Sequence, residues 1–286
     1  MKILKVSLAS LLLYTFFLAH SVSLVSCTKT KIEHDTTFVN HHDTTIINHT
    51  DTLIGSDSIY SITDGLVAYY NFNGGNLNDS SGYENNIVFS NATPTADRFG
   101  KPNNAFLFNG ASNYMYVKNA SSLNPNNAIT LMAIVKINGF YNGECNVNQI
   151  LGKGIDKTYG QYSLRFSDYV ANSCAISANT NHESFSAVYA SQIGDSIGAP
   201  YIKTGVWYNL IFTYDGIEGR FFINGQMVKS WKAFSNLTPN TNNLYIGAYE
   251  VMSQYPYWFN GVIDEIRIYN RGLPYGAIKE LNELKE

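Results

Sequence analysis

Near its C-terminal end the chain reads Phe259-Asn260-Gly261-Val262-Ile263-Asp264-Glu265-Ile266-Arg267-Ile268-Tyr269, and this stretch decides the fold. A period of two is typical of a β-strand, in which successive side chains point to opposite faces. Strict alternation predicts one face made of Val262, Asp264, Ile266 and Ile268, and another made of Ile263, Glu265, Arg267 and Tyr269. An unpaired carboxylate among aliphatic side chains is costly. We therefore expect Asp264 to bind a cation, to accept several backbone N–H bonds, or to lie at the rim of the core.

Many further strands are predicted from about Asp64 onward, separated by turns rich in Gly and Asn. The strand-like segments are 65–72, 105–108, 129–138, 207–215, 221–228 and 242–248. Two of them carry one apolar face, formed by Leu131, Ala133, Val135 and Ile137 in the first and by Tyr208, Leu210, Phe212 and Tyr214 in the second. Asn224-Gly225 supplies the two positive φ values that a type I′ hairpin turn requires.

Only the segment from Pro274 to Lys285 is helix-like, and Ala277, Ile278 and Leu281 can share one of its faces. Many short strands followed by one short C-terminal helix predict an all-β fold, an antiparallel two-sheet jelly-roll sandwich. Residues 62–286 are enough for one such domain with a substantial core.

The composition excludes one class of partner. The formal net charge is −3, only 14% of residues are charged, and the chain has 21 Tyr and 22 Gly. These values fit an exported β-protein with many turns. Because the sequence has no basic stripe, nucleic acid is not expected as a partner.

The N-terminus predicts export and a lipid anchor. Lys2 and Lys5 precede an apolar run from Val6 to Ala19, which is too short to span a bilayer and is built like a secretory signal. Leu24-Val25-Ser26-Cys27 resembles a bacterial lipobox, which implies a signal peptide of residues 1–26 and acylation of Cys27. The alternative is an ordinary signal peptide cleaved nearby, with Cys27 incidental.

The other two cysteines, Cys145 and Cys174, form an even pair in a chain bound for an oxidising space, so a disulfide is predicted. Two thiols without a nearby His pair lack the ligands that zinc needs. In a cytosolic chain both would instead be buried free thiols.

Residues 27–61 are predicted to form a polar stalk. The segment His34–His41 (HDTTFVNH) is followed at once by the similar His42–His49 (HDTTIINH). So few apolar residues cannot build a core, and the stalk should be extended; its oligomerisation is left open. Its histidines suggest metal binding, but we interpret them as part of the repeat. Asp-Thr and Asp-Ser pairs in the stalk resemble the O-glycosylation acceptor of Bacteroidetes-type exported proteins, with Thr36, Thr44, Thr52 and Ser58 as candidate sites.

Several motifs occur in the order found in laminin-G-like, concanavalin A-like modules of bacterial surface proteins. They are Asp64–Gly74 (DGLVAYYNFNG), Asn78–Gly82 (NDSSG), Asp97–Gly100 (DRFG), Phe108-Asn109-Gly110, Phe212–Gly216 (FTYDG), Asn224-Gly225 and the stretch 259–269. The chain resembles this family over nearly all of its domain, which implies the concanavalin A-like form of the jelly roll.

The same resemblance implies a structural calcium ion. Family members hold one between the opening segment and the closing strand. Carried over by position, its ligands are Asp79, Asn109, Asp264 and a backbone carbonyl near Gly110. Hard oxygen ligands suit calcium. Asn109 in place of the family's Asp removes one charge and should weaken binding.

No catalytic motif is found. Laminarinase-type relatives of this fold use a Glu-x-Asp-x-x-Glu run, which the sequence lacks. Binding modules instead present aromatic rings that stack on sugars. Rings in predicted loops are Tyr255, Tyr257 and Trp258, where Pro256 interrupts strand pairing, and also Tyr141 and Tyr201. Alternatively, the 255–258 loop folds over the edge of the sandwich.

The sequence therefore predicts a cell-envelope protein, an outer-membrane lipoprotein facing the periplasm or the outside, that recognises a glycan or a surface protein without catalysis. One alternative is a divergent polysaccharide-acting glycosidase or lyase on the same fold. Another is a structural subunit of an envelope complex. The ligand and the oligomeric state are left open.

Overall fold

The computed structural model describes residues 61–139, 148–154, 162–166, 176–180, 183–187, 202–232, 237–249 and 255–284. They all belong to one compact unit, Ile59–Glu286. Within these ranges no helix is both long and apolar enough to cross a bilayer. The predicted signal peptide and stalk lie outside them.

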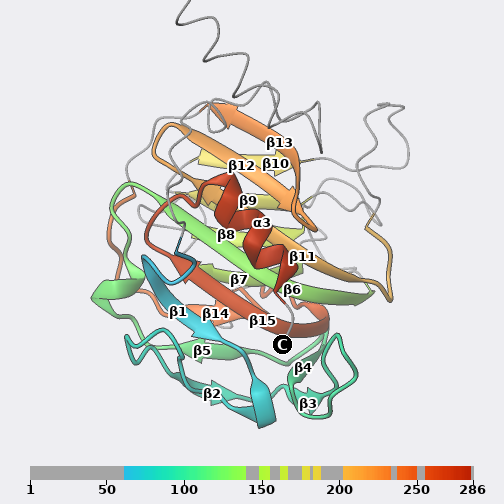
Figure 1. The fold of residues 1–286 in the computed structure, drawn as a ribbon. Helices are drawn as coiled ribbons and strands as arrows, with labels where there is room; N and C mark the ends of the chain where they lie inside the picture. The colour runs from blue at the N-terminus through green and yellow to red at the C-terminus, as the bar shows by residue number, and fades with distance from the viewer. Residues whose placement is uncertain are drawn as a thin grey trace, which may run out of the picture. The chain divides into compact units, whose positions relative to one another are not determined.

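The described residues form an antiparallel two-sheet sandwich, as predicted (Figure 1). Sheet A has the order β13 (Gln226–Lys232), β12 (Glu218–Ile223), β11 (Trp207–Tyr214), β6 (Ile129–Gly139), β15 (Asn260–Tyr269), β4 (Ala105–Asn109) and β3 (Thr93–Thr95), with β1 (Leu66–Tyr70) also pairing with β15. Sheet B has the order β10 (Glu183–Ala187), β9 (Ile176–Thr180), β8 (Tyr162–Phe166), β7 (Asn148–Lys153), β14 (Leu244–Ile246), β5 (Met115–Val117) and β2 (Ile87–Ser90). Short 3₁₀ turns lie at Asn73–Gly75 and Ser121–Leu123.

The main core fills the space between the two sheets. It contains Leu131, Ala133, Val135 and Ile137 of β6 and Tyr208, Leu210, Phe212 and Tyr214 of β11. Both alternations read from the sequence are therefore confirmed. The hairpin prediction is confirmed as well, since Asn224 and Gly225 have φ of 50° and 77° between β12 and β13.

Strand β15 departs from strict alternation. The register against β6 shifts between Ile263 and Glu265, which makes Asp264 the extra residue of a β-bulge. Because of that shift Ile263 faces the main core together with Ile266 and Ile268. The prediction that Asp264 shares a regular face with Ile266 was wrong, because the bulge resets the phase of the strand at that residue.

The outer face of sheet A is covered by the C-terminal helix α3 (Tyr275–Glu283), which lies in front of that sheet in Figure 1. The predicted face of α3 is confirmed: Ala277, Ile278 and Leu281 pack in a second apolar cluster with residues of sheet A such as Met132 and Phe222. Burial of this face, rather than helix propensity, keeps so short a helix in place.

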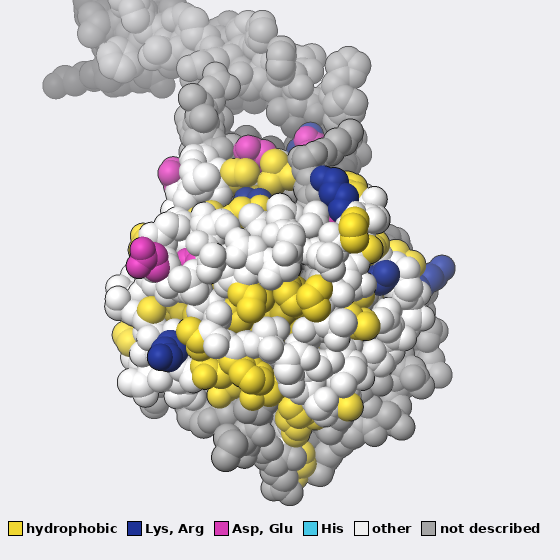
Figure 2. Space-filling model, turned by 90° about the horizontal axis from the view of Figure 1, so that it is seen from below, with side chains coloured by type: hydrophobic (Ala, Val, Ile, Leu, Met, Phe, Trp, Pro, Cys, Tyr) yellow, Lys and Arg dark blue, Asp and Glu magenta, His cyan; other side chains and the backbone are white. Residues whose placement is uncertain are grey.

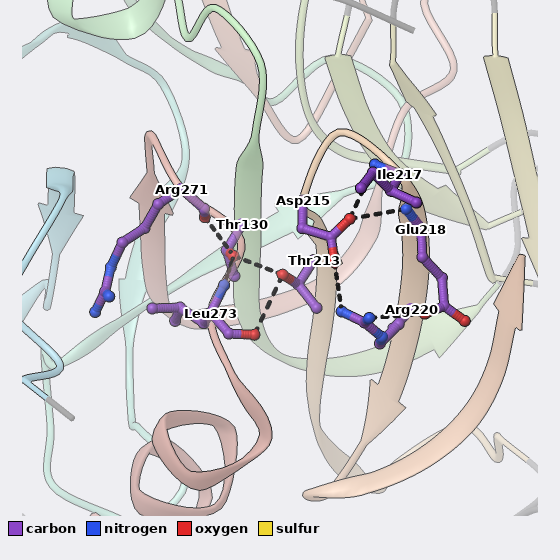
Figure 3. A network of polar contacts seen from close by, with 8 residues as sticks. All are labelled: Thr130, Thr213, Asp215, Ile217, Glu218, Arg220, Arg271 and Leu273. Atoms are coloured by element: carbon purple, nitrogen blue, oxygen red, sulfur yellow. Dashed lines mark hydrogen bonds and ion pairs between the residues drawn. The ribbon is translucent and has the colours of Figure 1, made fainter. Parts of the chain in front are cut away.

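A hydroxyl pair fixes the turn that leads into α3 (Figure 3). Thr130 Oγ1 donates to the carbonyl of Arg271 at 2.8 Å and accepts from the backbone N–H of Leu273 at 3.0 Å. Thr213 Oγ1 lies 3.1 Å from Thr130 Oγ1. Helix α3 is therefore tied to the central strands β6 and β11 of the sheet that it covers.

Truncation of the buried helix face tests this packing. Ile278 is fully buried, so Ile278→Ala should lower the free energy of unfolding by about 2–5 kcal/mol through lost contacts and a residual cavity. The matched control is Lys279→Ala, which removes a 60% exposed side chain and should change stability by less than about 0.5 kcal/mol. Urea unfolding measures both, and equal effects would contradict the docking of α3.

Candidate functional site

The bulge at Asp264 lies where β15 changes its partner along one edge. Residues up to Ile263 pair with β4, and residues from Ile266 onward pair with β1. The Arg98 guanidinium binds Asp264 in this interval, with Nη1 2.7 Å from Oδ2. The backbone N–H of Arg98 donates to the same oxygen at 3.3 Å. Among the arrangements expected for Asp264, the structure shows a pairing with a cationic side chain, that of Arg98.

The loop that carries Arg98 is shaped by its neighbour Asp97. Asp97 is buried and its Oδ1 accepts the backbone N–H groups of Phe99 and Lys101, at 2.8 and 2.9 Å. These bonds fold the segment between β3 and β4 into a tight loop. The conformation of this loop brings Arg98 against the bulge.

Burial dominates the electrostatics of this pair. Asp264 is 1% exposed, and its Oδ1 has no hydrogen-bond partner among the described residues. Loss of hydration raises the pKa of Asp264 to about 6, although Arg98 acts in the opposite direction. The neighbouring Glu265 pairs with Arg267 at 2.6 Å. The bulge is therefore a structural ion-pair cluster.

The other residues predicted as calcium ligands are engaged by protein donors. Asp79 accepts the N–H groups of Tyr69, Ser81 and Asn85 and the hydroxyl of Ser81, at 2.7–3.0 Å. Since these bonds use the N–H of Tyr69, Asp79 lies along the edge of β1 that does not pair with β15. As arranged, Asp79 and Asp264 do not offer a common set of oxygens, and calcium binding stays a prediction.

Asn109 and Gly110 form the turn after β4. Asn109 Oδ1 accepts the backbone N–H groups of Ala111, Ser112 and Asn113, at 2.9–3.1 Å. Gly110 has φ of 71°, and a Cβ there would come within 2.7 Å of Asn260. This turn directs the chain into Tyr114 and strand β5.

The predicted aromatic loop is only partly available to a ligand. Tyr257 is 7% exposed and contacts the rings of Tyr249 and Tyr255, at centroid distances of 5.7 and 6.2 Å. It therefore presents no free ring, and the reading of this loop as packed on the sandwich edge holds for Tyr257. Trp258 is half-buried, and its ring lies 6.2 Å from that of Tyr114.

That contact joins Trp258 to a row of rings on the outer face of sheet B. We define the ring row as Phe89, Tyr114, Tyr116, Tyr245 and Trp258. Neighbouring centroids are 4.7–6.3 Å apart. Register explains the row, since Tyr116 pairs with Phe89 of β2 on one side and with Tyr245 of β14 on the other. Paired residues share a face.

The ring row is accessible from solvent. Phe89 is 36% exposed, and the other four rings are half-buried. Figure 2 views the molecule from below Figure 1, from the side where β2 and β3 lie, and shows hydrophobic side chains gathered in bands with few charged side chains between them. Exposed aromatic side chains gathered in this way often mark a binding surface.

A pocket lies at one end of the ring row. It has a volume of about 180 Å³ and is lined by Gly154, Thr241, Asn242, Asn243 and Tyr245. Drug-sized ligands occupy larger pockets, of roughly 300–1,000 Å³. This one suits one small polar unit of a ligand beside an aromatic ring.

Sequence reasoning had singled out only Trp258 of the ring row. Three of the other rings could have been predicted from the alternation of inward and outward side chains along a β-strand. Tyr114 and Tyr116 flank the core residue Met115, and Tyr245 stands between the core residues Leu244 and Ile246. These tyrosines must therefore point outward. Among the remaining predicted residues, Cys27, Cys145, Cys174, Tyr141, Tyr201, Thr36, Thr44, Thr52 and Ser58 lie outside the described ranges.

Comparison with known proteins gives a family and a set of similar folds. A laminin-G model of the concanavalin A-like lectin/glucanases superfamily matches residues 109–279, more than half of the chain. No curated protein matches the sequence.

Two solved structures represent the similar folds. One is domain 4 of AbnA, a GH43 extracellular arabinanase from Geobacillus stearothermophilus, in complex with arabinotriose, with a TM-score of 0.55 and 20% identity over 76% of this chain and 98% of that one. The other is the binding domain of Paraclostridial Mosquitocidal Protein 1, with a TM-score of 0.59 and 14% identity over 78% of this chain. The present chain spans only 52% of that second chain.

The raised pKa of Asp264 predicts a specific pH dependence. A carboxyl that binds its proton more tightly in the folded state stabilises the fold at low pH and loses that contribution as pH rises from about 4 to about 6. The shift corresponds to a loss on the order of 3 kcal/mol. Asp264→Asn has no carboxyl to titrate and should not lose this stability. The free energy of unfolding of the variant minus that of the parent should therefore increase as pH rises from about 4 to about 6.

Urea unfolding of both proteins between pH 4 and pH 7 makes the measurement. Glu283→Gln changes a carboxylate that is 65% exposed and serves as the control. A constant difference between Asp264→Asn and the parent across this range would contradict the assignment.

Proposed function

The chain belongs to the concanavalin A-like lectin/glucanases superfamily, and on that premise we propose that its domain is a noncatalytic module that binds a glycan on the ring row of sheet B. The observation that carries the proposal is a set of partly exposed aromatic rings that continues into a pocket lined by uncharged polar residues. Both lie on the outer face of sheet B, whereas helix α3 covers the outer face of sheet A.

The chemistry of the surface favours a sugar. Aromatic faces stack on the C–H faces of pyranose and furanose rings, while amide and hydroxyl groups bond to sugar hydroxyls. Tyr245 belongs both to the ring row and to the pocket wall, so one side chain links the two kinds of contact. A protein partner would instead favour a broader apolar surface with a polar rim.

The similar structures support a glycan as the ligand. Domain 4 of AbnA is in complex with arabinotriose, a neutral oligosaccharide. Another similar structure belongs to botulinum neurotoxin type C, whose cell entry depends on interaction with two ganglioside molecules. At such low identity these neighbours show a shared fold, and the sugar ligand is taken from them only as a proposal.

Catalysis would need groups that the described residues of this surface do not supply. Glycoside hydrolysis uses two carboxylates on either side of the scissile bond, roughly 5–10 Å apart. The residues that form the ring row and the pocket are Phe, Tyr, Trp, Gly, Thr and Asn. A divergent glycosidase or lyase would have to act elsewhere on the fold, and turnover of a polysaccharide panel would reveal it.

We further propose that the module is tethered to the cell envelope through Cys27. The first described residues are held on the α3 side of the sandwich. The guanidinium of Arg271 donates to the carbonyls of Ser61 and Asp64, and Ile62 packs into the cluster beneath α3. The ring row is on the other sheet. Within the described domain, Ser61 and the ring row therefore belong to different sides of the sandwich.

The lipid anchor is tested on the whole chain. Wild-type protein expressed in a bacterium with lipoprotein processing should incorporate labelled palmitate and partition into the membrane fraction. Cys27→Ala should lose both properties, because the thiol is the only acceptor for the diacylglyceryl group. Ser26→Ala, which leaves the cysteine in place, is the control. Labelling that persists in Cys27→Ala would rule out this anchor.

Glycan binding is tested on an array with the purified protein and ring variants. Tyr116→Ala and Tyr245→Ala should each lower affinity about tenfold or more, equal to ~1.4 kcal/mol, because each removes a stacking face. Tyr83→Ala removes a ring that is 53% exposed and outside the row, and it should bind normally. Absence of binding by the parent protein, together with stoichiometric capture of an envelope protein, would replace the glycan with a protein partner.

A further inference from the structure

The pocket beside Tyr245 is walled by a segment that a buried lysine holds in place. Residues 240–243 lead into β14, and Leu244 at the start of that strand pairs with Lys153 at the end of β7. Gly154 follows Lys153 and lines the pocket. The pocket therefore depends on how residues 240–243 are fixed against the end of β7.

Lys153 provides the fixing contacts. Its side chain is fully buried, and Nζ donates to Asn124 Oδ1 at 2.8 Å, to Asn240 Oδ1 at 2.7 Å and to the carbonyl of Asn240 at 3.0 Å. An ammonium group has three donors, so all of them are used. Each acceptor is a neutral oxygen.

The two asparagines extend these contacts into the wall of the pocket. Asn124 Oδ1 also accepts the backbone N–H of Asn240, at 3.1 Å, and Asn240 Oδ1 accepts that of Asn242, at 2.9 Å. Each oxygen is shared between the ammonium and a backbone N–H, so loss of the ammonium would loosen both links. Residues 240 and 242 are positioned through Lys153.

Among the described residues, the buried ammonium of Lys153 has no carboxylate partner, which calls for an explanation. Removing such a charge from water is costly, and buried lysines are normally paired with an acid. The site tolerates it only because three oxygens solvate the group. An apolar side chain would fill the same space at a lower desolvation cost. The hydrogen bonds of Nζ to Asn124 and Asn240 are therefore the reason for a lysine at this position.

The pocket wall offers polar groups without charge. Thr241 is exposed and Asn242 is half-buried, and neither side chain makes a hydrogen bond with the described part of the chain. Asn243 Oδ1 accepts the N–H of Asn119, at 3.1 Å, which leaves its amide donors to face a ligand. With Tyr245 at one side, the set matches the hydroxyls and the C–H face of one uncharged sugar unit.

We propose that this pocket is the specificity subsite for one uncharged sugar unit of the glycan, and that Lys153 is the positioning residue that holds its wall. The inference rests on the glycan-binding function proposed above. The ring row supplies contact area to any sugar chain, whereas the pocket distinguishes one unit from another by its hydroxyls. A carboxylated sugar would find no cation among the lining residues.

The positioning role has a pH signature. Burial lowers the pKa of Lys153 to about 8, so the ammonium is present below that pH and is lost as pH rises through it. Among the described neighbours of Nζ, Asn124 and Asn240 do not titrate. Tyr162, which pairs with Lys153 from β8, is kept neutral because burial raises its pKa. Affinity for the sugar should therefore fall between about pH 7 and pH 9.

The test uses neutral arabino-, xylo- and cello-oligosaccharides, with galacturonate oligosaccharides as the acidic counterpart. The parent should bind a neutral set and not the acidic one. Asn242→Ala should lose about tenfold in affinity and change the preference among the neutral sets, because it removes a hydrogen-bonding group but no stacking face. Lys153→Met, similar in length but uncharged, should weaken binding at pH 7 by a similar factor and abolish the pH dependence.

Lys232→Met is the matched control. It removes an exposed lysine from β13 in sheet A and should keep both the affinity and the pH profile of the parent. If Lys153→Met does not fold, Asn240→Ala and the pH profile of the parent still decide the question. Asn240→Ala should bind the sugar more weakly than the parent at pH 7, and the parent should bind it more weakly at pH 9 than at pH 7.

The outcomes separate this inference from the function on which it rests. Normal affinity and preference in Asn242→Ala, with a flat pH profile in the parent, would overturn the subsite while Tyr116→Ala still established the ring row. Binding of the acidic set would also overturn it. Failure of the parent to bind any glycan would instead overturn the proposed function.

Discussion

One edge of β15 pairs with β4 up to Ile263 and with β1 from Ile266 onward, so neither strand pairs with the residues between them. The ion pair between Arg98 and Asp264 lies in that gap. Strand β15 pairs with β6 on its other edge, so it is the strand through which β1, β4 and β6 are held in one sheet. The bulge at Asp264, where β15 changes its partner from β4 to β1, lets Ile263 and Ile266 both face the core. The desolvation of Asp264 is the energetic consequence, and Arg98 offsets it only in part.

In the described part of the chain, the outer faces of the two sheets differ. Helix α3 and the turn tied to Thr130 bury the outer face of sheet A. Along β2, β5 and β14 of sheet B, outward residues remain open to solvent, and several are aromatic. Rings fixed on paired strands lose little conformational freedom on binding, which supports the recognition role proposed above.

Local signals in the sequence predicted most of the fold. The alternations in β6 and β11, the Asn224-Gly225 turn and the apolar face of α3 each depend on residues close together in the chain. The bulge was missed because strict alternation was assumed through Asp264-Glu265, although two isoleucines three positions apart are what a bulge produces. The ring row was missed because Phe89, Tyr116 and Tyr245 meet only through the register of three strands distant in sequence. Pairing register of that kind is not written in any one segment.

Asp264 and Lys153 are both buried charges, and the difference between them is informative. Asp264 has an arginine beside it, and their contact joins two parts of the framework. Lys153 has only neutral oxygens, all of them on segments next to the pocket. Stability alone would favour an apolar side chain at such a position. A group that is costly to bury and that orders a pocket wall would contribute to both affinity and selectivity, because it restricts the conformations in which the wall can meet a ligand. In the proposed function, the ring row would supply contact area and the pocket would supply fixed hydrogen-bonding geometry.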